Sequence, residues 1–434
     1  MNILHIAAHL GGGAGKAISG IAIQGQRDFS DTHRIILLQE PEKSGYVQAC
    51  EEHGVPVSVW NGDDALLRWA DVIVVSWWNH PVMAQFLRDF PEISVPVILW
   101  SHVNGCHYPM LPCQFVNAFD GVLFTSPYSL ENPIWTDAER EQIREHSELV
   151  WGIGQFAPEQ TAPKTEYRCQ DGFTVGYAGT LNYGKLHPEF VRYCKAVCDR
   201  IPAARFVMAG DRDQALERDV RQAGLEDRFV FPGYVADVPA LMRSFDVFGY
   251  LLNPEHYGTT ENVLLEAMAC GVPVAVLRQN VEQFIVPPEA GYLVETPRQY
   301  AECMDRLRRD QTLRERLGRG ARAHVIERYS AAENTARFRA ACLWAAGKAR
   351  RKHNFSFLGS SPWDWFVFFL DRQNRQIMER ARDFSEQGRS AQAGEQLRQC
   401  APILREERKS SLRHFAAVYP EDAVLWNCNS LLEK

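Results

Sequence analysis

The chain has 434 residues, of which 46% are hydrophobic and 23% are charged, and its formal net charge is −7. This length predicts two or three folded domains, and the acidic balance argues against a nucleic-acid-binding protein with a bulk basic surface. The 11 cysteines include no C-x-x-C pair, which argues against zinc sites and disulfide frameworks. The first residues do not resemble a secretory leader and no apolar run approaches about 18 residues, so we expect a cytoplasmic protein.

Short apolar runs alternate with helical patterns through the first part of the chain. The runs are rich in Val, Ile and Leu, which is typical of strands that are buried on both faces of a parallel sheet. They cover residues 3–7, 35–38, 55–60, 72–76, 97–100, 122–125 and 149–153. The alternation predicts a doubly wound, Rossmann-like α/β domain over residues 1–160.

The same alternation resumes after a loose polar segment over 156–172, which we interpret as a linker. The later apolar runs cover residues 173–177, 206–209, 229–231, 247–251, 272–276 and 292–294. They predict a second Rossmann-like domain over 173–345. Two domains of this type place a ligand cleft between the carboxyl ends of their sheets.

The glycine-rich stretch HLGGGAGKA follows the first apolar run at residues 9–17. A phosphate-binding P-loop requires a glycine at position 10 and a hydroxyl side chain at position 17, but the chain has Leu10 and Ala17 there. The stretch is therefore not a P-loop. Glycines before a helix let the backbone approach an anionic ligand, and a plain tight turn fits the pattern equally well.

The stretch YGTTENVLLEAMACGVPVAV at residues 257–276 predicts a helix with a buried apolar face. The amides of Thr260, Glu261 and Asn262 at its start suit a diphosphate. Glu266 can accept two hydroxyl hydrogen bonds at once, as from a ribose diol. The structural alternative is that acidic residues near the helix start only stabilise its dipole.

This stretch resembles the donor-site motif of the family 4 glycosyltransferases with the GT-B fold, in which a Glu-x7-Glu pattern runs into LLEAMACGVPVV. Glu266 matches the second glutamate of the motif. Gly258 stands at the position of the first glutamate, and Glu261 is a candidate catalytic substitute for it. The resemblance implies two Rossmann-like domains that face each other across a cleft and bind a nucleotide-sugar donor.

Other parts of the second domain carry the same resemblance. VGYAGTLNYGKLHP is similar to the family's diphosphate-binding segment, in which Lys185 matches the lysine and Thr180 stands where arginine is usual. Lys185 is therefore a candidate catalytic residue that stabilises the leaving diphosphate. VFPGYVADVPALMRSFDVFGYL is similar to a stretch that places Tyr234 and Val235 against the nucleotide base.

The resemblance is more diffuse in the first domain. The opening loop is similar to the family's glycine loop, which implies that Gly12 and Gly13 approach the donor. His102 matches the cleft histidine and is a candidate catalytic and acceptor-binding residue. Trp77 and Trp78 are candidates for stacking on an acceptor sugar, with burial in the core as the alternative.

The resemblance implies a retaining, metal-independent glycosyltransferase with a carbohydrate-like acceptor, a nucleotide-sugar substrate and no cofactor. The Asp-x-Asp triplet of the chain, at residues 211–213, resembles the family's turn near the nucleotide and not a metal site. Two rival hypotheses are a catalytically silent sugar-nucleotide-binding scaffold, favoured by Thr180 and Gly258, and a sugar-nucleotide epimerase of the same fold.

The last part of the chain, residues 346–434, matches no part of that family. It opens with a basic cluster followed by an aromatic segment, KARRKHNFSFLGSSPWDWFVFFLDR. We predict a helical extension in which a crossover helix over 361–379 packs its aromatic face on the first domain. The alternatives are peripheral contact with the inner membrane face and self-association.

Overall fold

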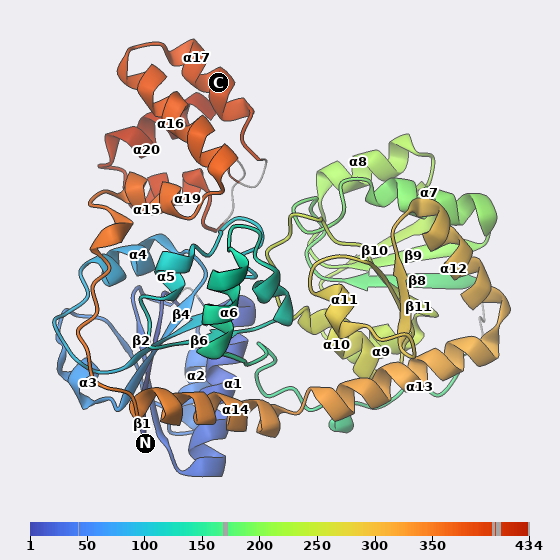
Figure 1. Cartoon of the computed structure of the whole chain (residues 1–434). Helices are drawn as coiled ribbons and strands as arrows, with labels where there is room; N and C mark the ends of the chain where they lie inside the picture. The colour runs from blue at the N-terminus through green and yellow to red at the C-terminus, as the bar shows by residue number, and fades with distance from the viewer. Residues whose placement is uncertain (42, 168–171, 402–403, 405–408, 433–434) are drawn as a thin grey trace. The chain divides into compact units, whose positions relative to one another are not determined.

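The computed structural model describes residues 1–41, 43–167, 172–401, 404 and 409–432 (Figure 1). The chain forms two compact units. Unit 1 comprises Met1–Gln155, Tyr257–Thr259 and Ala331–Lys434, and unit 2 comprises Phe156–His256 and Thr260–Ser330.

Unit 1 contains a seven-stranded parallel sheet with the strand order β3-β2-β1-β4-β5-β6-β7. The strands are β1 (Asn2–Ala7), β2 (Thr32–Leu37), β3 (Val57–Val59), β4 (Val72–Trp77), β5 (Val97–Ser101), β6 (Gly121–Phe124) and β7 (Ser147–Leu149). Six of the seven predicted runs of this region coincide with strands, whereas the run predicted over 149–153 shares only Leu149 with β7. A Cβ atom on Gly20 would lie 2.4 Å from Gly154 Cα, so the segment after β7 packs closely on a helix and leaves the sheet.

The helices of this sheet connect its strands in the doubly wound manner. They are α1 (Gly12–Phe29), α2 (Gly45–Glu52), α3 (Ala65–Trp69), α4 (Pro81–Arg88), α5 (Cys113–Val116) and α6 (Asp137–Glu145). The expected helix after the glycine-rich stretch is α1, and its apolar residues Ile18, Ile21 and Ala22 are buried against the sheet.

Unit 2 contains a six-stranded parallel sheet with the order β10-β9-β8-β11-β12-β13. Its strands are β8 (Phe173–Ala178), β9 (Ala204–Ala209), β10 (Phe229–Gly233), β11 (Val247–Tyr250), β12 (Val274–Leu277) and β13 (Gly291–Val294). Its helices are α7 (Phe190–Arg200), α8 (Gln214–Gln222), α9 (Val238–Ser244), α10 (Asn262–Ala269), α11 (Glu282–Ile285), α12 (Pro297–Arg309) and α13 (Gln311–Arg328). In both units the strand order reverses next to the first strand, and ligands of doubly wound sheets bind at such a point.

The chain returns to unit 1 earlier than the sequence predicts. Helix α14 (Ala331–Ala346) packs on the first sheet, where the ring of Phe338 lies 5.5 Å from that of Trp100 and 5.6 Å from that of His5. The predicted boundary at residue 345 is therefore corrected to residue 330, because burial of this aromatic face assigns α14 to unit 1.

The aromatic segment after α14 forms two helices and not the single helix expected over 361–379. They are α15 (Pro362–Phe368) and α16 (Arg372–Glu386), and they separate where Asp371 caps the start of α16. The predicted burial of the aromatic face on unit 1 is confirmed, since the ring of Phe369 lies 4.8 Å from that of Trp77 and 5.0 Å from that of Phe115.

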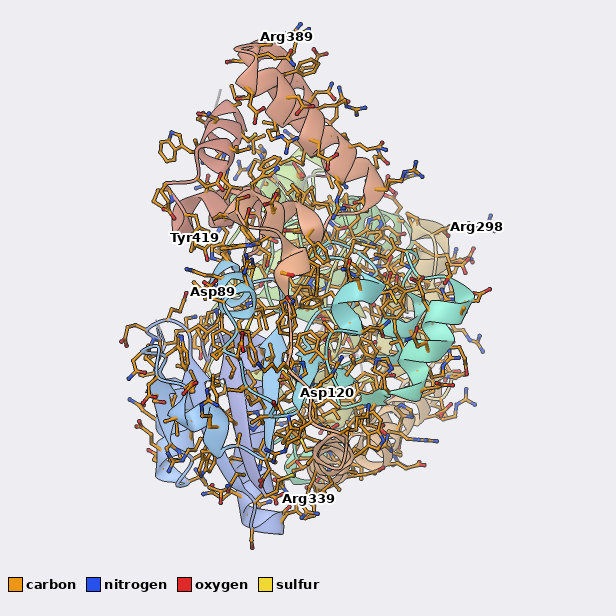
Figure 2. The ribbon with its side chains drawn as sticks, turned by 60° about the vertical axis from the view of Figure 1, so that its left-hand side comes forward. Asp89, Asp120, Arg298, Arg339, Arg389 and Tyr419 are labelled. Carbon is orange, nitrogen blue, oxygen red and sulfur yellow. The ribbon has the colours of Figure 1, made fainter. Side chains whose placement is uncertain are left out.

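In the described part of the extension, the chain continues with α17 (Ser390–Arg398), α19 (Leu412–Val418) and α20 (Ala423–Leu432). Tyr419 joins them to α4, because its hydroxyl donates to the Pro81 carbonyl at 3.1 Å. Figure 2 shows Tyr419 next to Asp89, which follows α4, and Arg389 at the far tip of the extension. Among the helices that the structure describes, none combines the length and the apolar character needed to cross a membrane.

Candidate active site

Three polar side chains of unit 2 surround the buried carboxylate of Glu261, directly before α10. Its backbone adopts the left-handed conformation with φ of 42°, and its side chain does not cap the helix. The Tyr250 hydroxyl donates to Oε2 at 2.5 Å, and Lys185 Nζ lies 3.4 Å from the same oxygen. His256 Nδ1 lies 3.4 Å from Oε1. The start of α10, the end of β11 and the loop after β8 thus meet at one carboxylate.

The charge of this cluster follows from its contacts. Burial acts to raise the pKa of Glu261, but Lys185 and His256 outweigh it and hold that pKa well below its usual range. Glu282, which is 1% exposed, behaves in the opposite way, because burial and the nearby Glu261 raise its pKa well above the ordinary value. The two carboxyl pKa values are therefore shifted in opposite directions, which favours the ionised form of Glu261 and the protonated form of Glu282.

Lys185 is fixed by the loop that follows β8. The Asn253 amide donates to the Lys185 carbonyl at 2.8 Å, and an antiparallel bridge joins Leu186 to Leu252, so the loop is held at the end of β11. Lys185 Nζ lies 5.5 Å from the centre of the Tyr250 ring, and its side chain keeps 22% exposure. The cation is thus oriented by protein groups and still reaches solvent.

The predicted helix start at 259–262 is confirmed, since α10 begins at Asn262. Glu266 follows in the second turn and is half-buried, whereas Thr260 is buried. In unit 1, Asn104 Nδ2 donates to the Gly258 carbonyl at 3.2 Å, so Asn104 holds the backbone at the position where the motif has a glutamate.

The other expected donor residues lie at the carboxyl ends of the unit 2 strands. Tyr234 follows β10 with 87% of its surface exposed, which leaves its ring open to a planar ligand. Thr180 follows β8 with an exposed side chain, and its carbonyl accepts from the Tyr177 hydroxyl at 2.8 Å. Asp213 accepts from the amides of Ala215 and Leu216 at the start of α8. Within the described ranges, no cluster of three His, Cys, Asp or Glu side chains is suited to a metal ion.

In unit 1, the expected histidine lies at the carboxyl end of the sheet. His102 directly follows β5, and its ring lies 4.7 Å from that of Trp100 and 6.1 Å from that of Trp78. Burial lowers the pKa of His102 to about 3, so its imidazole is neutral at neutral pH. Its Nε2 atom is buried without a hydrogen-bond partner among the described residues.

Trp77 does not have the role expected of it. It is 1% exposed and packs against Phe115 and Phe369, so no face of its ring is open to a sugar. Trp77 is therefore a core aromatic, which was the alternative interpretation. Every residue of β4 is buried, whichever face of the sheet its side chain lies on. Trp78, one residue beyond the strand, lies 5.2 Å from the ring of His9 at the sheet edge.

The glycines of the opening loop differ in whether packing leaves room for a side chain. A Cβ atom on Gly15 would lie 2.6 Å from the Leu10 backbone, so packing alone requires glycine there. Gly12 and Gly13 are exposed at the start of α1, and no atom lies within 4 Å of a Cβ built on either of them. Packing therefore does not explain these two glycines.

Sequence reasoning missed His256, Tyr250 and Glu282 as members of the unit 2 cluster. Tyr250 lay within a predicted strand, and its position as the last residue before the carboxyl edge was the signal that could have identified it. His256 and Glu282 lie in a loop and a short helix with no distinguishing pattern.

Comparisons with known proteins agree with this geometry. Residues 172–310 match the family model "Glycosyl transferases group 1". This segment of the chain is therefore similar to a group 1 glycosyltransferase domain. This domain contains all the residues of the Glu261 cluster.

Parts of the chain also align with individual glycosyltransferases. The 2-deoxystreptamine N-acetyl-D-glucosaminyltransferase of Streptomyces fradiae is 36% identical over 111 residues, which are 23% of this chain and 25% of the relative. The N-acetyl-alpha-D-glucosaminyl L-malate synthase of Bacillus anthracis is 30% identical over 158 residues, which are 33% of this chain and 41% of the relative. The chain thus spans less than half the length of these relatives.

A solved structure covers more of the chain. Anabaena HepE in complex with UDP superimposes with a TM-score of 0.60 at 18% identity, over 78% of this chain and 99% of HepE. This likeness shows the GT-B fold of two Rossmann-like domains, as predicted.

Proposed function

We propose that this protein transfers a sugar from a nucleotide-sugar donor to a carbohydrate-like acceptor, with retention at the transferred carbon and without a metal ion. The observation that carries the proposal is the pairing of Lys185 with Glu261 at 3.4 Å inside the matched glycosyltransferase domain. HepE has been solved with UDP and with UDP-glucose, so a UDP-sugar is the first donor to test.

The proposed role of Lys185 is to stabilise the diphosphate as it leaves. When the bond between the sugar carbon and the diphosphate oxygen breaks, negative charge grows on that oxygen, and a cation held in place lowers the energy of this state. Thr180 brings no charge, so Lys185 carries more of the stabilisation than it would beside an arginine. The ionised Glu261 keeps the ammonium oriented and limits its rotation.

The remaining donor contacts are assigned by their positions. Glu266 on α10 accepts the ribose hydroxyls, and the exposed ring of Tyr234, next to Val235, lies against the base. The first-turn amides of α10 add donors for the phosphates. Charge stabilisation by Lys185, together with the capping role of Asp213, supports a reaction that needs no metal ion.

The test is nucleotide release measured with and without acceptors. Binding of UDP, GDP and ADP to the full chain is first measured by calorimetry, and the UDP-sugars are then offered with a panel that includes 2-deoxystreptamine and L-malate. Release that depends on an acceptor supports the proposal. Release without any acceptor indicates an epimerase, and binding without release indicates a scaffold; either result refutes it.

A further inference from the structure

Among the described residues, four basic side chains meet at the carboxyl edge of the unit 1 sheet, and two of them come from the C-terminal extension. His9 follows β1 and His80 follows β4, whereas Lys409 and His414 lie next to and within α19. Lys409 Nζ lies 3.0 Å from His9 Nε2. The ring of His80 lies 4.8 Å from that of His414 and 5.5 Å from that of His9. We name these four residues the basic cluster.

A chain of hydrogen bonds holds the extension at the edge of the unit 1 sheet. Ser410 Oγ donates to the Trp78 carbonyl at 2.9 Å, and the Tyr108 hydroxyl donates to the Ser410 carbonyl. Asn79 Nδ2 in turn donates to the Tyr108 hydroxyl at 3.1 Å. Ser410 and Asn79 both adopt left-handed backbone conformations, with φ of 71° and 56°. Such conformations are unfavourable for residues other than glycine and persist where surrounding contacts enforce them, as happens at ligand sites.

His80 is the buried member of the basic cluster. It is 3% exposed, and its Nδ1 atom has no hydrogen-bond partner among the described residues. Burial, together with the smaller effects of His414, His9 and Lys409, lowers the pKa of His80 to about 2. A buried polar nitrogen without a partner is costly, and a ligand oxygen at this position would satisfy it.

The cluster favours an anionic ligand group. Neighbouring basic groups disfavour one another's protonated forms. A negative charge bound among them stabilises all of these protonated forms. A phosphate or carboxylate oxygen accepts from the ammonium and from imidazole N–H groups at once. His102, on the neighbouring strand end, contributes a second buried imidazole nitrogen without a partner in the described part of the chain.

We propose that residues 409–414 complete an acceptor subsite in unit 1, and that the basic cluster binds a phosphate or carboxylate group of the acceptor. The inference rests on the proposed transferase function, which assigns the donor to unit 2. Ligands of doubly wound sheets bind at the carboxyl ends of the strands, where His9 and His80 lie. The family model covers residues 172–310, so this subsite is built from residues outside the matched domain.

The test measures anion binding to the full chain by calorimetry, with inorganic phosphate and malonate as separate probes. We expect the double variant Lys409→Gln/His414→Gln to weaken binding of the preferred probe about tenfold or more, equal to about 1.4 kcal/mol. Lys409→Arg keeps the charge and should retain most of the affinity. Lys352→Gln is the matched control, since this lysine of the same extension pairs with Glu92 at 2.6 Å and lies outside the cluster.

Two further readouts separate this proposal from the donor assignment. UDP affinity should be unchanged in the double variant, and inorganic phosphate or malonate should inhibit acceptor-dependent UDP release in competition with the acceptor. Wild-type affinity of the double variant for both anions would overturn the subsite, and so would a parallel loss of UDP affinity. Failure of the wild-type protein to bind any nucleotide would instead refute the proposed function, whatever the anions do.

Discussion

Replacing Lys185 with alanine separates what the buried ion pair does for stability from what it does for turnover. Lys185 and Glu261 are 3.4 Å apart, and their side chains are 22% and 4% exposed. Removing one partner of a fully buried pair costs about 3–5 kcal/mol. Because Lys185 reaches solvent, screening reduces the expected loss to about 1–3 kcal/mol in the free energy of unfolding.

The loss should depend on pH in a defined direction. Lys185 lowers the pKa of Glu261 below its ordinary 4.5 in the folded wild type, so this carboxylate stabilises the fold above pH 4.5 and loses that effect in stronger acid. Without the ammonium, the Glu261 pKa is higher than in the wild type, because only His256 and Tyr250 remain to oppose the effect of burial. The difference in unfolding free energy between the wild type and Lys185→Ala should therefore be full at pH 7 and shrink as the pH falls below 4.5.

The double variant Lys185→Ala/Glu261→Gln supplies the decisive comparison. Neutral glutamine leaves no uncompensated charge, so we expect stability close to the wild type, measured by urea unfolding followed by tryptophan fluorescence. Turnover should stay as low as in Lys185→Ala, because the cation that stabilises the diphosphate is still missing. A double variant as unstable as the single one, or a Lys185→Ala enzyme with wild-type turnover, would refute this reasoning.

Three further outcomes follow from the structure. Glu282→Gln should raise the melting temperature at pH 8 and have little effect near pH 4.5, because the raised Glu282 pKa makes wild-type stability fall with pH above 4.5, by at most about 1.4 kcal/mol per unit; equal shifts at both pH values would contradict this. Glu266→Ala should weaken UDP binding by about 2–3 kcal/mol in calorimetry with the fold intact by circular dichroism; unchanged affinity would exclude the ribose role. Deleting residues 361–434 should give insoluble protein, since it uncovers Trp77 and Phe115; a soluble, active truncation that no longer pellets with anionic vesicles would favour the membrane-anchor hypothesis.

The strands could be predicted because their signal is local. A strand buried on both faces must be apolar along its whole length, and each predicted run overlaps a strand, although the run over 149–153 does so only at Leu149. The unit to which a helix returns has no such signal. α13 ends at Arg328 and α14 begins at Ala331, and no glycine or proline in between marks the point where the chain leaves unit 2.

The sequence predicted individual residues of the candidate site but not the contacts between them. The resemblance identified Lys185 and Glu261 separately, one for the diphosphate and one for the sugar. Their pairing depends on the adjacency of β8 and β11 in the sheet and on the left-handed turn at Glu261. The local sequence predicts neither feature. Glutamate rarely adopts a positive φ, and the order of the strands depends on the whole unit.

Neither apolar patterning nor the family resemblance could have predicted the basic cluster. Lys409 and His9 are 400 positions apart, and their meeting depends on α15 packing on α4 and on Ser410 binding the backbone beyond β4. The family model covers residues 172–310, which contain the proposed donor site. A segment without a counterpart in the matched domain that reaches the edge of the other sheet can change the acceptor without touching donor binding. Variation in residues 409–414 should therefore alter acceptor preference and leave nucleotide affinity constant.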